Sequence, residues 1–355
     1  MAVKLRYIVF NDPHLSSTAP SSRRLDDYEE ACFDKLRQIR DLCVDNKVHA
    51  LLCTGDWFHK KNPAAVPHAL VRRAMDWADT LPCRLYTIAG NHDVRFSDTS
   101  EASLAKQPFG VFTRHPNISV VSPGSHFFLS SWKDGEQPEQ GDLFCNRITL
   151  TGQHFWAPEY GEDGEPSENK WQFFPMTQSS SKEFIVHLCH ANVVGSTPMW
   201  KPHTLVEDVF KNTNANIVHC GHIHDDIGIF KGENMKGVEA YFTNVGSITR
   251  GALNEETLTR EPQVLLVEVD LLSFMVSMQR ITLEHKPNEE IYDIDAYESR
   301  KEDRTAVKEW SGKVRDELLK RTEEKEESVE EIIARTDLLD HPARELARSI
   351  LSDSE

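Results

Sequence analysis

The chain has 355 residues, of which 39% are hydrophobic and 27% charged, and its formal net charge at pH 7 is −17. This composition fits a globular protein with a sizeable core, and no apolar run approaches the roughly 20 residues of a membrane-spanning helix. The acidic excess disfavours a nucleic-acid ligand without excluding one, because Lys and Arg hold phosphate backbones whereas bound divalent cations would offset part of the negative charge.

Residues 1–125 alternate between strand-like and helix-like segments. An apolar run predicts a strand over Leu5–Phe10, and apolar residues at three- and four-residue steps predict a helix from about Asp26 to Asp45. A strand over His49–Cys53, a helix over His68–Thr80 and a strand over Leu85–Ala89 follow. This order predicts βαβ units of an α/β fold, in which functional residues gather beyond the carboxyl ends of the strands.

The second half of the chain has three parts. Gly, Glu, Pro, Gln and Ser dominate two stretches of residues 131–183, which predicts an exposed insertion with one strand inside it, Arg147–Gly152. Strands are then predicted over Phe184–Leu188, Ile217–Cys220, Ala240–Asn244, Val264–Val269 and Phe274–Ile281. From about Ile291 the chain is charged and predicted to be helical, with an apolar stripe at Val307, Trp310, Val314 and Leu318. We therefore expect one domain over residues 1–284 and a helical C-terminal extension over residues 285–355.

Cysteine usage and the N-terminus bear on the compartment. Seven cysteines are scattered without a CxxC pair, which favours reduced thiols over a disulfide framework or a zinc finger. The first ten residues lack the basic, apolar and small-residue regions of a signal peptide. We expect a cytoplasmic protein that does not bind membranes.

Side chains that can bind metal follow five of the predicted strands, each directly at the carboxyl end. They occur in the segments Asp12-Pro13-His14, Gly55-Asp56-Trp57-Phe58-His59, Gly90-Asn91-His92-Asp93, His190 and Gly221-His222-Ile223-His224. Each segment alone is compatible with an ordinary turn, loop or helix N-cap. Because all five lie at strand ends, we expect them to meet in one site.

The residue types predict a site for two ions. One carboxylate can offer an oxygen to each of two metals, so Asp56 is the expected bridge. The first ion would be held by Asp12, His14, Asp56 and His224, and the second by Asp56, Asn91, His190 and His222. Mixed carboxylate, amide and imidazole ligation favours manganese, iron or zinc over calcium or a thiolate site.

The remaining polar residues near these motifs need separate assignments. His187 and His219 lie inside predicted strands, and we expect them in the core rather than on a metal. His92 follows a ligand directly and is expected to reach the substrate, where it would stabilise the transition state or protonate the leaving oxygen. Asp93 either orients His92 or forms the turn.

The order DxH, GD, GNHD, H and GHxH resembles the signature of the calcineurin-like metallophosphoesterases over about residues 4–250. The resemblance implies the fold of that family, an α/β four-layer αββα sandwich of two facing sheets, and a dinuclear centre bridged by Asp56. The second motif, GDxFH, is similar to that of the nuclease subunit of SbcCD-type double-strand-break repair complexes, in which the histidine at the position of His59 helps to place the scissile phosphate. The stretch Asn244–Ser247 with Arg250 also resembles that family, with Val245 where proline is usual.

These observations predict a metal-dependent phosphoesterase, a hydrolase, and favour a Mn-dependent DNA exo/endonuclease of DNA repair that attacks the phosphodiester with a metal-bridging hydroxide. Fe or Zn are the alternative ions. A small-molecule or nucleotide phosphoesterase of the same fold is an open alternative, and a non-catalytic scaffold is disfavoured because every ligand is present. The adjacent lysines Lys60 and Lys61 either contact a phosphate backbone or form a solvated turn. The resemblance also implies that the C-terminal helices bind a coiled-coil ATPase, and it leaves a homodimer open.

Overall fold

The computed structural model describes residues 4–20, 23, 27–95, 98–129, 148–155, 173–175, 183–196, 203–251, 253 and 255–295. Most of the expected insertion and the whole apolar stripe that begins at Val307 lie outside these residues. Contacts divide the chain into one unit over Met1–Tyr292 and another over Asp293–Glu355. The boundary expected after residue 284 stays a prediction.

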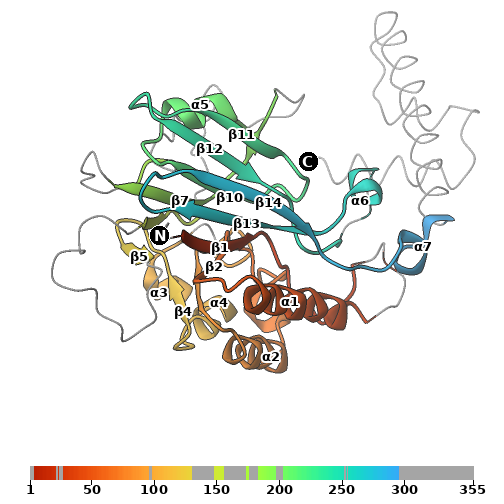
Figure 1. Cartoon of the computed structure of the whole chain (residues 1–355). Helices are drawn as coiled ribbons and strands as arrows, with labels where there is room; N and C mark the ends of the chain where they lie inside the picture. Colours follow the sequence, from red (N-terminus) through yellow and green to blue (C-terminus); the bar gives the residue numbers. More distant parts are fainter. Residues whose placement is uncertain are drawn as a thin grey trace, which may run out of the picture. The chain divides into compact units, whose positions relative to one another are not determined.

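Two six-stranded sheets form the centre of the larger unit (Figure 1). The strand order is β14-β13-β1-β2-β3-β4 in the first sheet and β11-β12-β10-β7-β6-β5 in the second. Four adjacent strands of each sheet, β1 to β4 and β12-β10-β7-β6, run parallel to their neighbours. The carboxyl ends of these strands therefore meet at one edge of each sheet.

The strands and helices have the following bounds. The first sheet contains β1 (Lys4–Phe10), β2 (Ala50–Cys53), β3 (Arg84–Thr87), β4 (Ile118–Val120), β13 (Gln263–Asp270) and β14 (Val276–Thr282). The second contains β5 (His126–Leu129), β6 (Ile148–Gly152), β7 (Phe184–His190), β10 (Ile217–Gly221), β11 (Gly228–Glu233) and β12 (Glu239–Asn244), while β8 (Val193–Val194) pairs with β9 (Thr204–Leu205). The helices are α1 (Tyr28–Asp45), α2 (His68–Asp79), α3 (Glu101–Leu104), α4 (Pro108–Phe112), α5 (Val206–Lys211), α6 (Glu255–Thr259) and α7 (Asn288–Ile291), and Pro63–Ala65 forms a 3₁₀ turn.

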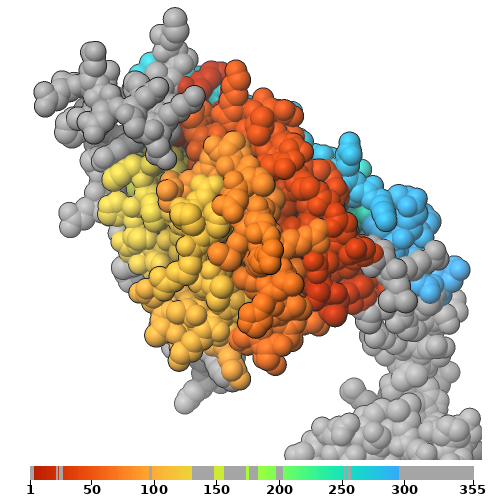
Figure 2. Space-filling model, turned by 90° about the horizontal axis from the view of Figure 1, so that it is seen from below, coloured from red at the N-terminus to blue at the C-terminus, as the bar shows by residue number. Residues whose placement is uncertain are grey.

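Alternation along the strands produces four layers. In β1, Tyr7 and Val9 pack against strands of the second sheet, whereas Ile8 and Phe10 pack against α1 and α2, as a side-chain period of two requires. On the outer face of the second sheet, α5 packs through Val206. The order helix, sheet, sheet, helix confirms the predicted αββα fold class, and Figure 2 shows the outside of the first helical layer, coloured red to yellow.

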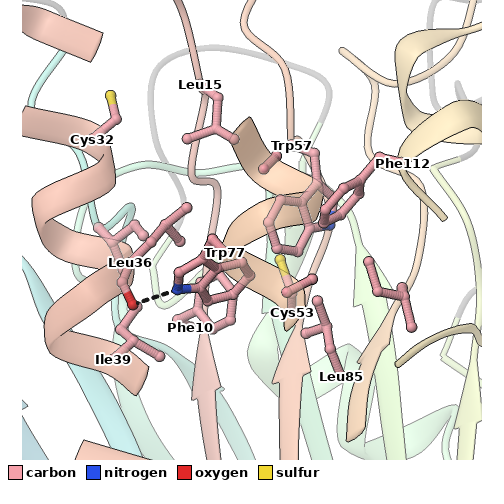
Figure 3. Packing of buried hydrophobic residues seen from close by; sticks show 14 of the residues in the cluster. Phe10, Leu15, Cys32, Leu36, Ile39, Cys53, Trp57, Trp77, Leu85 and Phe112 are labelled. Carbon is pink, nitrogen blue, oxygen red and sulfur yellow. Dashed lines mark hydrogen bonds between the residues drawn. The ribbon is translucent and has the colours of Figure 1, made fainter. Parts of the chain in front are cut away.

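The first helical layer shows why these segments are helical. In α1, Cys32, Leu36, Ile39 and Cys43 recur at three- and four-residue steps and are all buried, so one face of the helix covers the sheet. The Asp27 side chain caps the helix by accepting from the Glu30 amide at 2.9 Å. Trp77 of α2 donates its indole N–H to the Leu36 carbonyl of α1 at 2.8 Å, which joins the two helices (Figure 3).

The structure corrects several predicted boundaries. The strand expected over Phe184–Leu188 extends to His190, so this residue ends β7 instead of opening the next turn. The strand expected from Phe274 begins at Val276, because Phe274 lies in the hairpin turn with a φ of 56°. The hairpin strand β11 was not predicted, since its Gly-rich sequence lacks the alternation of a half-buried strand. No helix in the described ranges is long and apolar enough to cross a membrane.

Tyr7 and His219 form a buried polar contact between the two sheets. The Tyr7 hydroxyl of β1 lies 3.0 Å from His219 Nε2 of β10, and His219 Nδ1 lies 2.6 Å from the Thr243 hydroxyl of β12. Burial lowers the pKa of His219 to about 3, so the ring is neutral and has one donor and one acceptor nitrogen. The two hydroxyls satisfy both, which confirms His219 as a core residue. His187 is likewise buried, 2.8 Å from the Thr151 hydroxyl.

We predict that Tyr7→Phe lowers the free energy of unfolding by about 1–3 kcal/mol, because it leaves a buried imidazole nitrogen unpaired. Urea denaturation with a chelator present measures the change without a contribution from bound metal. Tyr241→Phe is the matched control, since its hydroxyl bonds Glu239 at the surface, and we expect a loss within about 0.5 kcal/mol. Equal losses in both variants would contradict a structural role for the contact between the sheets.

Candidate metal centre

The five polar segments meet at the carboxyl edge of both sheets. Three of them follow strands of the first sheet, after β1, β2 and β3, and two lie at the ends of β7 and β10 in the second sheet. Each sheet therefore supplies part of one site. The buried side chains among the candidate ligands are Asp12, His14, Asp56 and His190; Asn91 and His222 are half-buried and His224 is exposed.

The backbone at these residues is strained. Among the described non-glycine residues six have a positive φ, and four of them are Asp12 (50°), His14 (44°), Asp56 (57°) and His222 (92°). Side chains other than glycine rarely adopt this conformation, and it costs of order 1–3 kcal/mol at each residue. Strain concentrated on four candidate ligands indicates that their positions serve a purpose other than stability.

Two glycines let the strand ends approach closely. A Cβ on Gly55, which has a φ of +99°, would lie 2.6 Å from the amide nitrogen of Gly90. A Cβ on Gly90 would lie 2.1 Å from Asp56 Oδ1. The glycines of the second and third motifs are therefore needed for the backbones to pass each other beside the Asp56 carboxylate.

Asp56 lies between two groups of ligands. Its Oδ2 atom is 3.3 Å from His14 Nε2 and 3.4 Å from His190 Nε2. On the first side, His14 Nε2 lies 2.8 Å from His224 Nε2. The second side comprises His190, His222 and Asn91. Asp56 therefore lies between His14 and His224 on one side and the second group on the other, and the assignment of each ligand to one of two ions stays a prediction.

The second group converges on the Asn91 carboxamide. One end of that amide lies 3.0 Å from His190 Nε2, 2.9 Å from His222 Nδ1 and 3.2 Å from Asp56 Oδ2. If this end is the oxygen, four atoms that can coordinate a cation face one another. If the amide is turned, its NH₂ group faces the other three atoms and its two hydrogens can bond His222 Nδ1 and Asp56 Oδ2. A cation in this space would select the first orientation.

Asp12 extends the set toward β10. Its two carboxylate oxygens each lie 3.2 Å from the His222 amide nitrogen, and Oδ1 lies 3.7 Å from His190 Nδ1. Ligand atoms of Asp12, Asp56 and His190, and those of His14, Asp56 and His224, all lie within 4.8 Å of one another in each group.

Contacts behind the ligands fix their orientation. His190 Nδ1 donates to the Thr54 carbonyl at 2.8 Å, which turns Nε2 toward Asp56 as ligating histidines require. The His92 amide donates to Asp56 Oδ1 at 2.7 Å, so Oδ2 alone faces the histidines. The sequence did not single out Thr54, because a backbone carbonyl leaves no signal in the residue type.

Electrostatics supports a cation at this place. Burial alone would lower the pKa of His190, but the carboxylates of Asp56 and Asp12 raise it to about 10. Without a metal, the proton on His190 therefore offsets the negative charge of these carboxylates, which a bound cation would otherwise offset. Burial and the Asp56 charge raise the pKa of Asp12 to about 7, against the effect of His190. Burial leaves the nitrogen Nδ1 of His14 without a hydrogen-bond partner. The donor set of carboxylate, amide and imidazole atoms fits two divalent ions.

His92 and His59 lie beside the first group. Their rings stack at 5.6 Å with an angle of 20° between the planes, and the His92 ring centroid is 4.7 Å from that of His14. His92 Nδ1 donates to the His59 carbonyl at 2.6 Å. The second motif therefore orients the catalytic candidate of the third.

Asp93 has a different environment from His92. Its Oδ1 accepts from the Trp57 amide at 2.9 Å and its Oδ2 from the Gly90 amide at 3.0 Å. The carboxylate thus joins the loops of the second and third motifs, which favours the turn assignment over the orientation of His92. Burial and the Asp56 charge raise the pKa of Asp93 to about 8.

The turn after β12 supports the first and fifth motifs. The Ser247 hydroxyl donates to the Asp12 carbonyl at 2.7 Å, and its amide donates to the His224 carbonyl at 3.0 Å. Gly246 has a φ of 77°, and a Cβ there would lie 2.6 Å from that same His224 carbonyl. The tight turn is thus kept with Val245 in the place of a proline, by an Asn244 side chain that accepts from the Gly246 amide at 2.8 Å.

Phe155 is a site residue that the sequence did not reveal. Its ring centroid lies 5.9 Å from that of His190 and 5.7 Å from that of His222. Its amide donates to the Ala89 carbonyl at 2.8 Å, directly before the GNHD motif. A single aromatic residue after a strand carries no sequence signal for such a position.

Comparisons with known proteins bear on this geometry. The family described as calcineurin-like phosphoesterase matches residues 5–226, which is more than half of the chain. No curated protein matches.

Similar solved structures include the calcineurin-like phosphoesterase YfkN from Bacillus subtilis, with 11% identity over 81% of this chain and 94% of that chain and a TM-score of 0.44. A dimetal phosphatase from Danio rerio is 14% identical over 80% of this chain and 100% of that chain, with a TM-score of 0.42. An archaeal phosphodiesterase is 11% identical over 78% of this chain and 100% of that chain, with a TM-score of 0.34.

We predict that Asp56→Asn removes most of the bound metal, because an amide provides one neutral oxygen where the bridge needs two charged contacts. Metal content after desalting, measured by mass spectrometry, should fall from about two ions per chain to less than one. Asp226→Asn is the control, since Asp226 lies two residues after His224 but pairs with Arg280. Two ions retained in Asp56→Asn would contradict the bridging position.

Proposed function

We propose that this chain, which belongs to the calcineurin-like phosphoesterase family, is a dinuclear-metal phosphodiesterase that cleaves DNA, with manganese as its working ion. The observation that carries phosphoester hydrolysis is the convergence of six other candidate ligands around Asp56, with His92 and His59 beside them. Such ligation by mixed N and O atoms is suited to divalent ions that act on phosphate.

The ligands would be shared between two ions. Asp12, His14, Asp56 and His224 would hold the first, and Asp56, Asn91, His190 and His222 the second. When bound, such a pair activates a water molecule and neutralises charge on the phosphate. Their binding would release the proton that the carboxylates hold on His190.

His92 is the residue that we propose to handle the leaving group. Because Nδ1 donates to the His59 carbonyl, Nε2 is the nitrogen left to contact a substrate. Burial lowers the pKa of His92, so the ring is neutral before substrate binds. A bound phosphate brings negative charge, which raises that pKa and favours a proton on Nε2 for transfer to the leaving oxygen.

The DNA substrate is supported by the second motif. GDxFH is similar to the motif of SbcCD-type nuclease subunits, and the geometry puts the His59 ring within 5.6 Å of both the His14 and the His92 ring. His59 is therefore close enough to the centre to contact a scissile phosphate. Asp93 would act only through the loops that it joins.

A small-molecule or nucleotide phosphoesterase is the second candidate, favoured by the net charge of −17, since a DNA duplex is attracted by basic surfaces. A coiled-coil ATPase partner, bound through the C-terminal extension, stays a proposal because the apolar stripe lies outside the described residues. The same holds for a homodimer and for a cytoplasmic location.

The test of substrate class compares linear duplex DNA, a cyclic nucleotide and an aryl phosphate as substrates of the Mn-loaded protein. We expect metal-dependent cleavage of the DNA, and Asp56→Asn should abolish it. Brisk hydrolysis of a small ester without DNA cleavage would replace the nuclease by the second candidate. Metal uptake without hydrolysis of any of the three would favour the scaffold.

For His92→Asn we predict a loss of roughly 10²- to 10⁴-fold in kcat, the usual contribution of a general acid, with both metal ions retained. His126→Asn serves as the control, since His126 is exposed on the edge strand β5 and its ring packs against Phe128. Measuring kcat on the preferred substrate and the metal content of the same samples separates a loss of catalysis from a loss of bound metal. Full activity of the metal-loaded variant would remove His92 from the mechanism.

A further inference from the structure

Two adjacent exposed lysines, Lys60 and Lys61, follow the GDxFH motif, and the structure distinguishes between them. The Nζ atom of Lys61 lies 3.2 Å from the Asn91 carboxamide, at the end that faces away from His190 and His222. No comparable contact joins Lys60 to a candidate ligand within the described ranges.

The Asn91 amide links Lys61 to the metal centre. Its oxygen can face only one side at a time. Without a cation between the ligands, the amide can turn its NH₂ group toward them, donate to His222 Nδ1 and Asp56 Oδ2, and accept from Lys61 with its oxygen. With a cation there, the oxygen must face the ion, so the NH₂ group faces the Lys61 ammonium. Two donors then oppose each other, and the ammonium is left in need of an acceptor.

Among the residues that the structure describes, no carboxylate pairs with Lys61 to fill that need. None of the ion pairs in the described part of the chain involves Lys61. Its charge nevertheless acts on the site: burial lowers the pKa of His92, and Lys61 contributes in the same direction. The Lys61 ammonium is exposed, lies beside Asn91 and His92, and has no acidic partner in the described ranges. It is therefore positioned to bind an anionic group of the substrate.

We propose that Lys61 is a phosphate-binding residue whose ammonium contacts a non-bridging oxygen of the substrate phosphate at the metal centre. The proposal rests on the proposed function and adds a specificity residue to it. Lys61 contacts the phosphate equally in the bound substrate and in the transition state, so it contributes to the affinity for substrate. His92 contributes to the chemical step instead. Lys60 is solvated and has no such role.

The experiment measures binding of inorganic phosphate to the Mn-loaded full chain by calorimetry, together with metal content and steady-state hydrolysis. For Lys61→Gln we expect two ions retained, a phosphate Kd weakened roughly 10- to 100-fold, as for the loss of a hydrogen bond to a charged group, and a change mainly in KM. Lys61→Arg should recover most of the affinity because it keeps the charge. Lys60→Gln carries the same loss of charge and should change the Kd by less than about threefold.

Three results would overturn the proposal. Unchanged phosphate affinity in Lys61→Gln would show that the ammonium does not contact the anion. Equal losses in Lys60→Gln and Lys61→Gln would assign the effect to the general charge of the loop. A wild-type protein that takes up two ions but neither binds phosphate nor hydrolyses a phosphoester would overturn the proposed function as well, whereas the first two results leave that function intact.

Discussion

The buried Asp56 carboxylate is the constraint on which the rest of this structure depends. It is 1% exposed and lies among histidines from both sheets, where an uncompensated charge would be costly. Although burial opposes ionisation, the neighbouring His190 lowers the pKa of Asp56 well below its usual range. The strained backbone at four candidate ligands and the contact between Gly55 and Gly90 serve to bring partners to this one group. Stability alone does not account for such an arrangement, and a bound pair of cations does.

The two-sheet architecture explains how residues up to 212 positions apart form one site. The first sheet holds Asp12, Asp56 and Asn91, and the second holds His190 and His222. Their relative position depends on the packing between the sheets, which includes the buried pair Tyr7 and His219, 212 residues apart. Bonds from Ser247 then connect the loops of the first and fifth motifs. The site is therefore a property of the whole domain and would be lost if the sheets moved apart.

Much of this could be read from the sequence, for physical reasons that differ among residues. The central strands are continuous apolar runs, and polar residues at their ends must lie at one edge of a sheet, so the sequence predicts that Asp12, Asp56, Asn91, His190 and His222 meet there. The structure places them together, and the family match covers the same segment. Thr54 and Phe155 could not be found in this way, because one acts through its carbonyl and the other through its place beside two rings. The sequence also could not show that Lys61, and not Lys60, lies beside Asn91, because the two lysines are adjacent and chemically identical.

The most direct test of the account is a crystal structure of the Mn-loaded protein with anomalous diffraction at the manganese edge. A dinuclear centre should give two anomalous peaks about 3.5–4 Å apart, with Asp56 Oδ2 between them and the Asn91 oxygen facing the peak that His190 and His222 share. A single peak, or two peaks away from Asp56, would contradict it.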